Sequence, residues 1–274
     1  MNQRHEIVDS TMLKSCCANV YQSDLASLLL GDSFHPGGVK LTEHLGELLH
    51  LRPTQHVLDV ASGQGTSAIT FAQCFGCQVL GIEYGYDAVQ RATHAAEVAG
   101  VSHLVSFQQG DAEHLSIPES TFDAVLCECA FCTFPDKLTA AKEFMRVLKP
   151  GGQVGLSDLT RIGSIPAELQ GLLALIACIA DAQPVEEYTR YLTEAGLIID
   201  AVEAHDEALS EMVQQMRGKL LGAELLTLLK KIELPFAIDF EYAKALMKAA
   251  STAIQARQFG YAVIMARKSN ASHK

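Results

Sequence analysis

The sequence has no long apolar run, and its opening residues do not resemble a secretion signal. Its longest uninterrupted apolar run, residues 172–180, is too short to cross a lipid bilayer as a helix. Residues 1–6 lack the basic flank and the apolar core of a signal peptide. We therefore expect a cytoplasmic protein that does not bind a membrane.

Clustered basic residues are also scarce. They occur together only at Lys230 and Lys231, and the formal net charge of the chain is −11. Because nucleic-acid-binding proteins generally present a basic face, we expect a small-molecule partner and no nucleic acid. The eight cysteines are expected to be reduced in a cytoplasmic chain, and no spacing resembles a closed zinc site, so no metal is expected.

What the sequence does contain is organised around residues 57–65, which read Val-Leu-Asp-Val-Ala-Ser-Gly-Gln-Gly. An apolar segment typical of a buried strand leads into a loop of small residues, and a helix is predicted to follow. Gly63 and Gly65 allow positive φ angles and the close approach of a ligand. The exposed amides at the start of the helix suit a carboxylate or a phosphate. On its own, this glycine pattern is weak evidence.

Further strand and helix segments alternate along the chain. A second apolar strand ends at Glu83, 18 residues after Gly65, about where a ribose-binding carboxylate belongs in a nucleotide-binding βαβ unit. A third strand ends near Asp111. The remaining predicted strands are residues 122–127, 153–156, 197–203 and 260–267, and predicted helices cover residues 39–50, 67–75, 87–99, 136–148, 166–181 and 184–195.

The ordered motifs Asp-x-x-x-Gly-x-Gly, Gly-Ile-Glu, Gly-Asp-Ala, Phe-Asp-Ala-Val and Leu-Lys-Pro-Gly-Gly resemble those of class I S-adenosylmethionine-dependent methyltransferases, over about residues 50–160. One departure is Ala61, which stands where the family usually has the first glycine of the loop. The resemblance implies an α/β fold with a Rossmann-like seven-stranded sheet, whose last strand is antiparallel, and S-adenosylmethionine as cofactor.

The resemblance also implies the cofactor site. Glu83 would accept hydrogen bonds from both ribose hydroxyls, and Asp111 would accept one from the adenine amino group, with Ala112 beside the ring. The methionine part would lie against the loop. The complete set of cofactor residues expected from the resemblance is Asp59, Ala61, Gly63, Gly65, Glu83, Tyr84, Asp111, Ala112 and Cys127.

The expected domain organisation has four parts. Residues 1–50 form a helical cap over the cofactor, and residues 51–204 form the Rossmann-like core. Residues 205–259 are a helical insertion between the last two strands, which could serve as a homodimer surface or as a second flap over the acceptor. Residues 260–274 supply the last strand and a tail.

The methyl acceptor is predicted from cysteines. Cys129 lies six residues before Pro-Asp-Lys, as in arsenite methyltransferases, which the chain resembles most in pattern. Cys178, together with Cys16 or Cys17, would complete a set of three thiolates, the ligands that soft trivalent arsenic prefers. The same cysteines are equally compatible with ordinary packing in the protein core.

Other acceptors remain open, because residues 20–38 and 204–267 do not resemble arsenite methyltransferases. Hydrogen sulfide, methanethiol or another small thiol would need a compact pocket and a proton acceptor, for which His35 and Tyr21 are the candidates. A carbon, nitrogen or oxygen atom of a small metabolite, such as a quinone or sterol-like ring, is the alternative. A non-catalytic cofactor-binding sensor or helper subunit is a further one.

Overall fold

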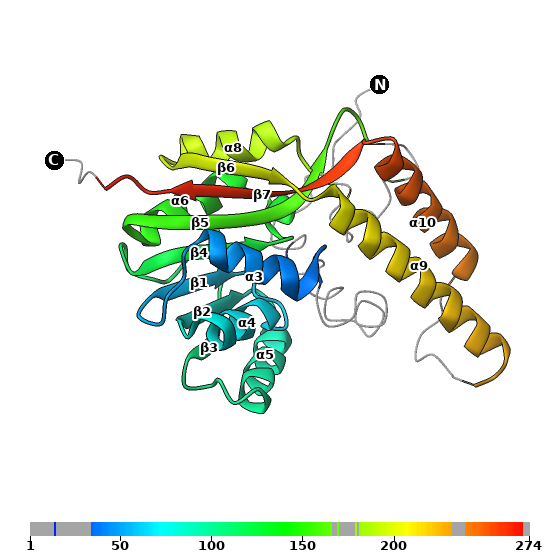
Figure 1. The fold of residues 1–274 in the computed structure, drawn as a ribbon, viewed down its shortest axis with the longest axis horizontal. Coiled ribbons are helices and arrows are strands. Elements are labelled where there is room, and N and C mark those ends of the chain that lie inside the picture. The colour runs from blue at the N-terminus through cyan, green and yellow to red at the C-terminus, as the bar shows by residue number, and fades with distance from the viewer. Residues whose placement is uncertain are drawn as a thin grey trace, which may run out of the picture.

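The computed structural model describes Lys14 and residues 34–165, 169, 179, 181–231 and 239–270, and every structural statement below concerns these residues. Seven strands form one sheet in the order β3-β2-β1-β4-β5-β7-β6. The strands are β1 (His56–Val60), β2 (Gln78–Glu83), β3 (Val105–Gln109), β4 (Phe122–Glu128), β5 (Leu148–Arg161), β6 (Ile198–Ala204) and β7 (Phe259–Arg267). Figure 1 shows this order face on.

The direction of the strands matches the expectation. Strands β1 to β5 pair in parallel, whereas β7 runs antiparallel to both of its neighbours, β5 and β6. The Rossmann-like seven-stranded sheet with an antiparallel last strand is therefore confirmed. Strand order reverses between β1 and β4, and in open parallel sheets ligands bind at the carboxyl ends of the strands beside such a reversal.

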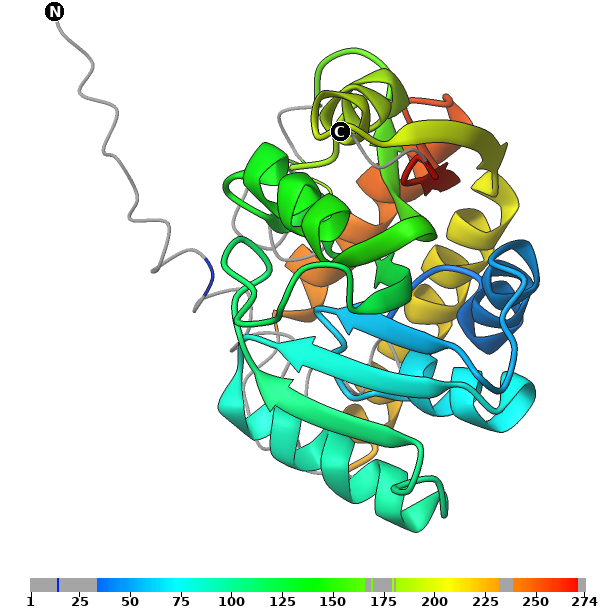
Figure 2. The same ribbon diagram turned by 90° about the vertical axis from the view of Figure 1, so that its left-hand side faces the viewer.

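Helices cover both faces of the sheet. They are α3 (Gly38–Leu48), α4 (Thr66–Phe75), α5 (Tyr86–Val98), α6 (Lys137–Val147), α8 (Val185–Glu194), α9 (Asp206–Leu228) and α10 (Phe240–Gln255), with a short 3₁₀ turn at Phe131–Thr133. Helix α3 packs against α4, and α6 packs against α8. In Figure 2 the blue α3 and the green α6 lie on opposite sides of the central strands. None of the described helices is long and apolar enough to cross a membrane.

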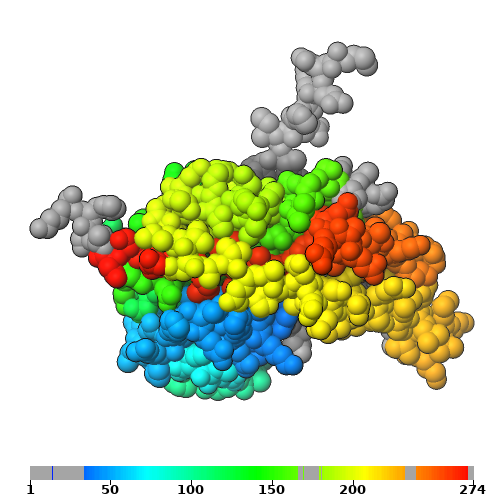
Figure 3. Space-filling model, turned by 45° about the horizontal axis from the view of Figure 1, so that its top comes forward, coloured from blue at the N-terminus to red at the C-terminus, as the bar shows by residue number. Residues whose placement is uncertain are grey.

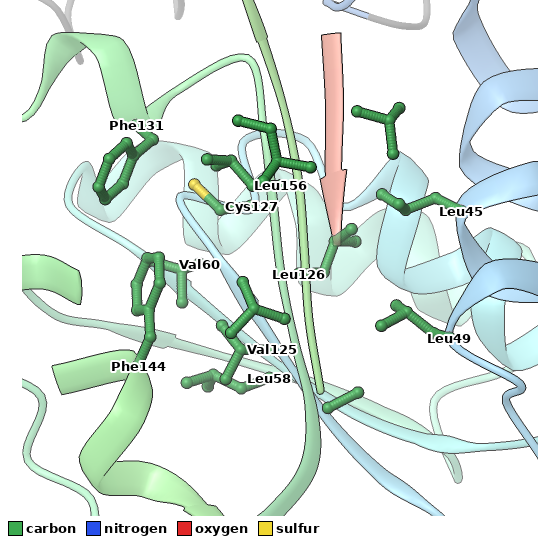
Figure 4. Close-up of a cluster of buried hydrophobic side chains, with 14 of the residues drawn as sticks. Leu45, Leu49, Leu58, Val60, Val125, Leu126, Cys127, Phe131, Phe144 and Leu156 are labelled. Carbon is green, nitrogen blue, oxygen red and sulfur yellow. The ribbon is translucent and has the colours of Figure 1, made fainter. Parts of the chain in front are cut away.

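The core consists of two apolar layers separated by the sheet. Alternate residues of β4 point to opposite faces, so Leu126 lies toward Leu45 of α3 and Leu49 just after that helix, while Cys127 lies toward Phe131 (Figure 4). These side chains are almost completely buried. Within the cap predicted for residues 1–50, helix α3 is thus bound to the sheet by its own leucines, while residues 1–33 lie, apart from Lys14, outside the described residues.

The predicted insertion before the last strand contains α9 and α10, which pack against each other. The pair extends beyond the end of the sheet (Figure 1), and the far end of α9 stands clear of the body in the space-filling view (Figure 3). Four leucines of α9 and Leu229, the residue after it, have exposed fractions of 42 to 74%. The four in the helix are Leu221, Leu225, Leu226 and Leu228. The hairpin therefore carries an unusually apolar surface.

Candidate active site

A cleft opens at the carboxyl ends of β1, β2 and β4, beside the reversal in strand order. Its described lining comes from the ends of β1, β2 and β4 and the loops after them, from the loop after β3, from α4 and α5, from the residues before α3 and from Lys14. The residues that line it are Lys14, Phe34, His35, Asp59, Ala61, Ser62, Gly63, Gln64, Thr66, Ser67, Ile82, Glu83, Tyr84, Ala88, Arg91, Gly110, Asp111, Ala112, Glu128, Cys129, Ala130, Thr133 and Phe134.

The loop after β1 has the left-handed backbone that the glycine pattern predicted. Gly63 and Gly65 have φ angles of +54° and +81°, and a Cβ added at Gly63 would meet no atom within 4 Å. Ala61 also lies in the left-handed region, with φ of +58°. An L-residue other than glycine is strained there by about 1–2 kcal/mol, so the departure at Ala61 has a conformational cost.

Glu83 ties this loop to the end of β2. One of its carboxylate oxygens accepts the Gly63 amide at 3.0 Å, and the other accepts the Gly85 amide, also at 3.0 Å. Each carboxylate oxygen has a second lone pair, so Glu83 can still accept two hydroxyl groups from a ligand. The acid is thereby fixed in position at the edge of the cleft with acceptor capacity to spare.

Asp59 is the feature that best fits a positively charged ligand. Its Oδ2 atom and the Ser62 hydroxyl are buried without a hydrogen-bond partner. Burial, followed by the nearby charges of Glu128 and Glu83, raises the pKa of Asp59 well above its ordinary value. The carboxylate has a backbone hydrogen bond from Ala68, but a buried charge with one oxygen unpaired is costly, and a cation bound in the cleft would relieve that cost. The sulfonium and ammonium groups of S-adenosylmethionine supply such charges, so these residues fit the cofactor.

Asp111 forms an ion pair with Lys14. Lys14 Nζ donates to Asp111 Oδ2 at 2.8 Å and to Glu113 Oε2 at 2.6 Å. Burial alone would raise the pKa of Asp111, but the hydrogen bonds from Lys14 and from the Glu113 amide outweigh burial and lower it. Asp111 is therefore ionised at neutral pH and is available as an acceptor at this end of the cleft.

A chain of three polar side chains lies near the end of β4, and its two outer members, His35 and Glu128, line the cleft. The Thr42 hydroxyl lies 3.2 Å from His35 Nε2 and 3.0 Å from Glu128 Oε2. The other ring nitrogen, His35 Nδ1, lies 3.1 Å from the Pro36 carbonyl oxygen. Because a carbonyl oxygen only accepts, Nδ1 must carry a hydrogen.

Because the Thr42 hydroxyl has a single hydrogen, it can donate to only one of its two neighbours, and this limits the protonation states of His35 and Glu128. If Thr42 donates to Glu128, His35 Nε2 must donate to Thr42, and the ring is an imidazolium. If Thr42 instead donates to His35, Glu128 must carry a proton to donate to Thr42. In both fully hydrogen-bonded states, His35 and Glu128 share one proton that can pass through the Thr42 hydroxyl.

Two more hydroxyl groups hold Glu128 in place. Ser67 donates to Oε2 at 2.5 Å, and Ser157 lies 3.5 Å from Oε1. Ser157 in turn accepts from the Tyr261 hydroxyl at 3.0 Å. These contacts come from α4, β5 and β7, so the carboxylate is positioned by three elements distant in sequence.

Most of the expected cofactor residues meet at this cleft, but two do not line it. A Cβ added at Gly65 would come within 2.4 Å of the Phe107 ring, so this glycine permits close packing in the interior. Cys127 was expected at the cofactor and is instead fully buried on the Phe131 side of the sheet (Figure 4). Burial raises the pKa of Cys127, which makes it an unreactive packing residue.

Of the expected acceptor residues, His35 and Cys129 line the cleft. Cys129 has a φ of +52°, and its amide donates to the Ser157 carbonyl at 2.7 Å. The expectations for Cys16, Cys17, Tyr21 and Cys178 lie outside the described residues.

Glu128, Thr42 and Ser67 were not among the site residues predicted from the sequence. Glu128 had a recognisable signal of a functional residue, because it ends a buried parallel strand as Glu83 does. It lies between two cysteines in the sequence, however, and the cysteines were interpreted as the functional residues instead. Thr42 and Ser67 carry no signal of this kind, since only the packing of α3 and α4 brings them to Glu128.

Comparisons with known proteins point to methyl transfer. Residues 58–156 match a family described as "Methyltransferase domain". The chain is 29% identical over 196 residues to 27-O-demethylrifamycin SV methyltransferase of Amycolatopsis mediterranei, covering 66% of this chain and 72% of that protein. It is 33% identical over 128 residues to sterol 24-C-methyltransferase erg6 of Aspergillus fumigatus, covering 47% and 34%.

A third relative is phosphoethanolamine N-methyltransferase 1 of Zea mays, 29% identical over 66% of this chain. The chain spans only about a third of the length of the maize and Aspergillus proteins, 32% and 34% respectively. These three relatives are named for different acceptors, so the sequence matches agree on the methyl transfer and not on the substrate.

Solved structures share the fold. Phosphoethanolamine N-methyltransferase 2 of Haemonchus contortus in complex with S-adenosyl-L-methionine has a TM-score of 0.76 at 18% identity, covering 94% of this chain and 60% of that one. The cyclase SpnF has a TM-score of 0.73 at 22% identity, covering 96% and 97%. Because SpnF is named for a cyclisation, the fold by itself does not fix the reaction.

The domain matched over residues 58–156 and the fold shared with a structure that binds S-adenosyl-L-methionine support an S-adenosylmethionine-dependent methyltransferase. A closer similarity to arsenite methyltransferases is not found among these relatives.

Proposed function

We propose that the protein transfers a methyl group to a hydroxyl group of a small, partly apolar metabolite. The observation that carries this proposal is the His35–Thr42–Glu128 chain at the cleft. A hydroxyl acceptor is protonated at neutral pH and becomes a better nucleophile as its proton leaves. The relative from Amycolatopsis, whose name describes an O-methylation, is in keeping with such an acceptor.

In this proposal the cofactor supplies an activated methyl group, and the side chains of the cleft position the cofactor. Glu83 accepts the two ribose hydroxyls, and Asp111 accepts the adenine amino group. Asp59, with its buried Oδ2 atom lacking a partner, balances positive charge. Ala61, Gly63, Tyr84 and Ala112 form the surface against which the cofactor lies. The protein thus aligns the cofactor with the acceptor and excludes water.

Glu128 then removes the proton of the acceptor. Before the reaction, the His35–Thr42–Glu128 chain lacks the shared proton, so one of its two contacts through Thr42 has no hydrogen. When the acceptor oxygen bonds to the methyl carbon, its proton passes to Glu128, and the bonding electrons of the broken carbon–sulfur bond stay on sulfur. The proton completes the hydrogen bonds of the chain and can move on through Thr42 to His35.

A second candidate is a soft acceptor, either a small thiol or arsenite. It is favoured by Cys129, whose strained left-handed backbone lies in the cleft beside Glu128. Strained residues are found disproportionately at functional sites. A thiol would use Glu128 as its proton acceptor, whereas arsenite would use the Cys129 thiolate as a ligand.

The test is an assay with methyl-labelled S-adenosylmethionine and hydroquinone, methanethiol or arsenite as acceptor. We expect label on the hydroquinone oxygen, and we expect Glu128→Gln to lower kcat by about 10²–10⁴, the usual contribution of a general base. Cys129→Ser is the matched control and should retain hydroquinone methylation. Arsenite methylation that Cys129→Ser abolishes would replace the first candidate with the second, and no product from any of the three would refute both.

We also propose that the exposed leucines of α9 join two copies of the chain. Leu221, Leu225 and Leu228 are spaced by four and three residues and therefore share one helix face. No described residue of the cleft lining comes from α9 or α10, which favours an interface over a flap. Light scattering should give a dimer that Leu225→Glu dissociates, and a wild-type monomer at all concentrations would refute this.

A further inference from the structure

Two histidines and a glutamate converge outside the described lining of the cleft. His44 lies on α3, Glu203 lies near the end of β6, and His205 immediately precedes α9. His44 Nε2 is 2.8 Å from Glu203 Oε2, and His205 Nε2 is 3.3 Å from the same oxygen. The two imidazole rings are inclined to each other, with centroids 5.8 Å apart. Each imidazole ring therefore directs its Nε2 atom toward the Glu203 carboxylate.

This arrangement has the dimensions of a metal site. One ligand atom from each residue can be chosen so that all lie within 4.8 Å of one another. Zinc binds imidazole nitrogen and carboxylate oxygen at about 2.0–2.2 Å, so neighbouring ligand atoms around a tetrahedral ion lie about 3.3 Å apart. The observed separations of 2.8 and 3.3 Å need only small side-chain rotations to admit an ion.

We propose that His44, Glu203 and His205 bind a divalent transition-metal ion, zinc in particular. Two imidazoles and one carboxylate suit zinc, nickel, cobalt and copper rather than magnesium or calcium, which prefer oxygen ligands. The three side chains are partly exposed, so the ion can enter from solvent and keep water in its remaining position.

The site would connect distant parts of the chain. His44 and Glu203 are 159 residues apart in sequence, so an ion would fasten α3 to the junction of β6 and α9. It would be distinct from the cleft, because none of the three residues lines the cleft. A ligand that binds only the folded state stabilises it, so we assign the ion a structural role. Sequence spacing could not reveal this site, because only Glu203 and His205 are close together along the chain.

Calorimetric titration of the tag-free, reduced protein with zinc chloride tests the proposal. We expect one zinc ion to bind per wild-type chain and to raise the melting temperature. The double variant His44→Ala/His205→Ala should weaken this binding at least tenfold and lose the increase in melting temperature. Glu203→Gln, which keeps the shape of the side chain, should weaken binding in the same direction.

Controls separate this site from other ligands in the chain. His94→Ala removes an exposed histidine that also lies beside a glutamate, Glu97, and should leave zinc binding unchanged. Cobalt(II) bound to the wild type should show no thiolate-to-metal charge-transfer band, because cysteine is absent from the set. Zinc binding that persists unchanged in the double variant, or a thiolate band with cobalt, would overturn the proposal, as would a wild-type chain that binds no zinc.

Discussion

The hydroxyl of Thr42 and the carboxylate of Glu128 lie 3.0 Å apart, although 86 residues separate them in sequence. Helix α3 is anchored on the sheet by Leu45 and Leu49, and this packing delivers Thr42 to the end of β4. The hydrogen-bonded chain from His35 to Glu128 therefore depends on core packing. Its proposed role in proton transfer can be tested with variants of Thr42.

Thr42→Val should impair turnover while leaving cofactor binding intact, because valine matches threonine in shape but cannot pass a proton. We expect kcat to fall by about tenfold or more, a part of the usual contribution of general base catalysis. Thr42→Ser retains the hydroxyl and should restore most of the activity. The measurement is kcat against pH for the three proteins, together with calorimetry of S-adenosylhomocysteine. Equal rates for valine and serine variants would contradict a proton path through this hydroxyl.

Cofactor affinity should rise with pH through the titration of Asp59. Burial, with the charges of Glu128 and Glu83, raises the folded-state pKa of Asp59 above its ordinary value of 3.8, so the protonated form is favoured in the free protein. A bound cation favours the ionised form, so binding below the raised pKa must release a proton. Calorimetry in two buffers of different ionisation enthalpy measures this release. Asp59→Asn should abolish it, and identical proton release in that variant would assign the effect to another group.

Ala61→Gly should stabilise the protein. Relief of the left-handed strain gains about 1–2 kcal/mol, and the greater freedom of glycine in the unfolded chain removes about 0.5–1 kcal/mol of this. The net expectation is a gain of about 0.5–1 kcal/mol in the free energy of unfolding, measured with urea. Ala95→Gly is the control, because Ala95 lies within α5 with ordinary helical geometry and should cost about 1 kcal/mol. Destabilisation by both substitutions would show that the strain at Ala61 is not relieved.

Gly65→Ala should destabilise the fold more than Gly63→Ala does. Both glycines have positive φ, but only the Cβ at Gly65 would meet the Phe107 ring, at 2.4 Å. Overpacking typically costs about 1–3 kcal/mol in addition to the backbone strain that the two variants share. Urea unfolding of the two proteins gives the difference, and equal losses would mean that Phe107 moves aside freely.

The fold could be predicted from the sequence because the patterns that indicate it lie within short continuous segments. Strand β1, its loop and Glu83 lie within one continuous segment, and the alternation of apolar strands with helices predicts a parallel sheet. Gly65 was assigned to the cofactor from the glycine pattern and the resemblance, and Cys127 from the resemblance; neither could reveal that Gly65 packs against Phe107 or that Cys127 faces Phe131.

The polar network of the site was harder to predict from the sequence, because it depends on contacts between residues far apart along the chain. His35 was predicted from its type as a candidate proton acceptor, but its link to Glu128 requires the register of α3 against the sheet. The same reason hid His44 and Glu203, which meet only after the last strands have assembled.

A crystal structure with S-adenosylhomocysteine is the most direct test of the central claim, that the cofactor occupies the cleft above the loop after β1. We expect ribose hydroxyls within hydrogen-bonding distance of the Glu83 carboxylate and the sulfur atom on the side of the cleft formed by Glu128 and Cys129. A ligand bound elsewhere, or in this cleft without contact to Glu83, would contradict it.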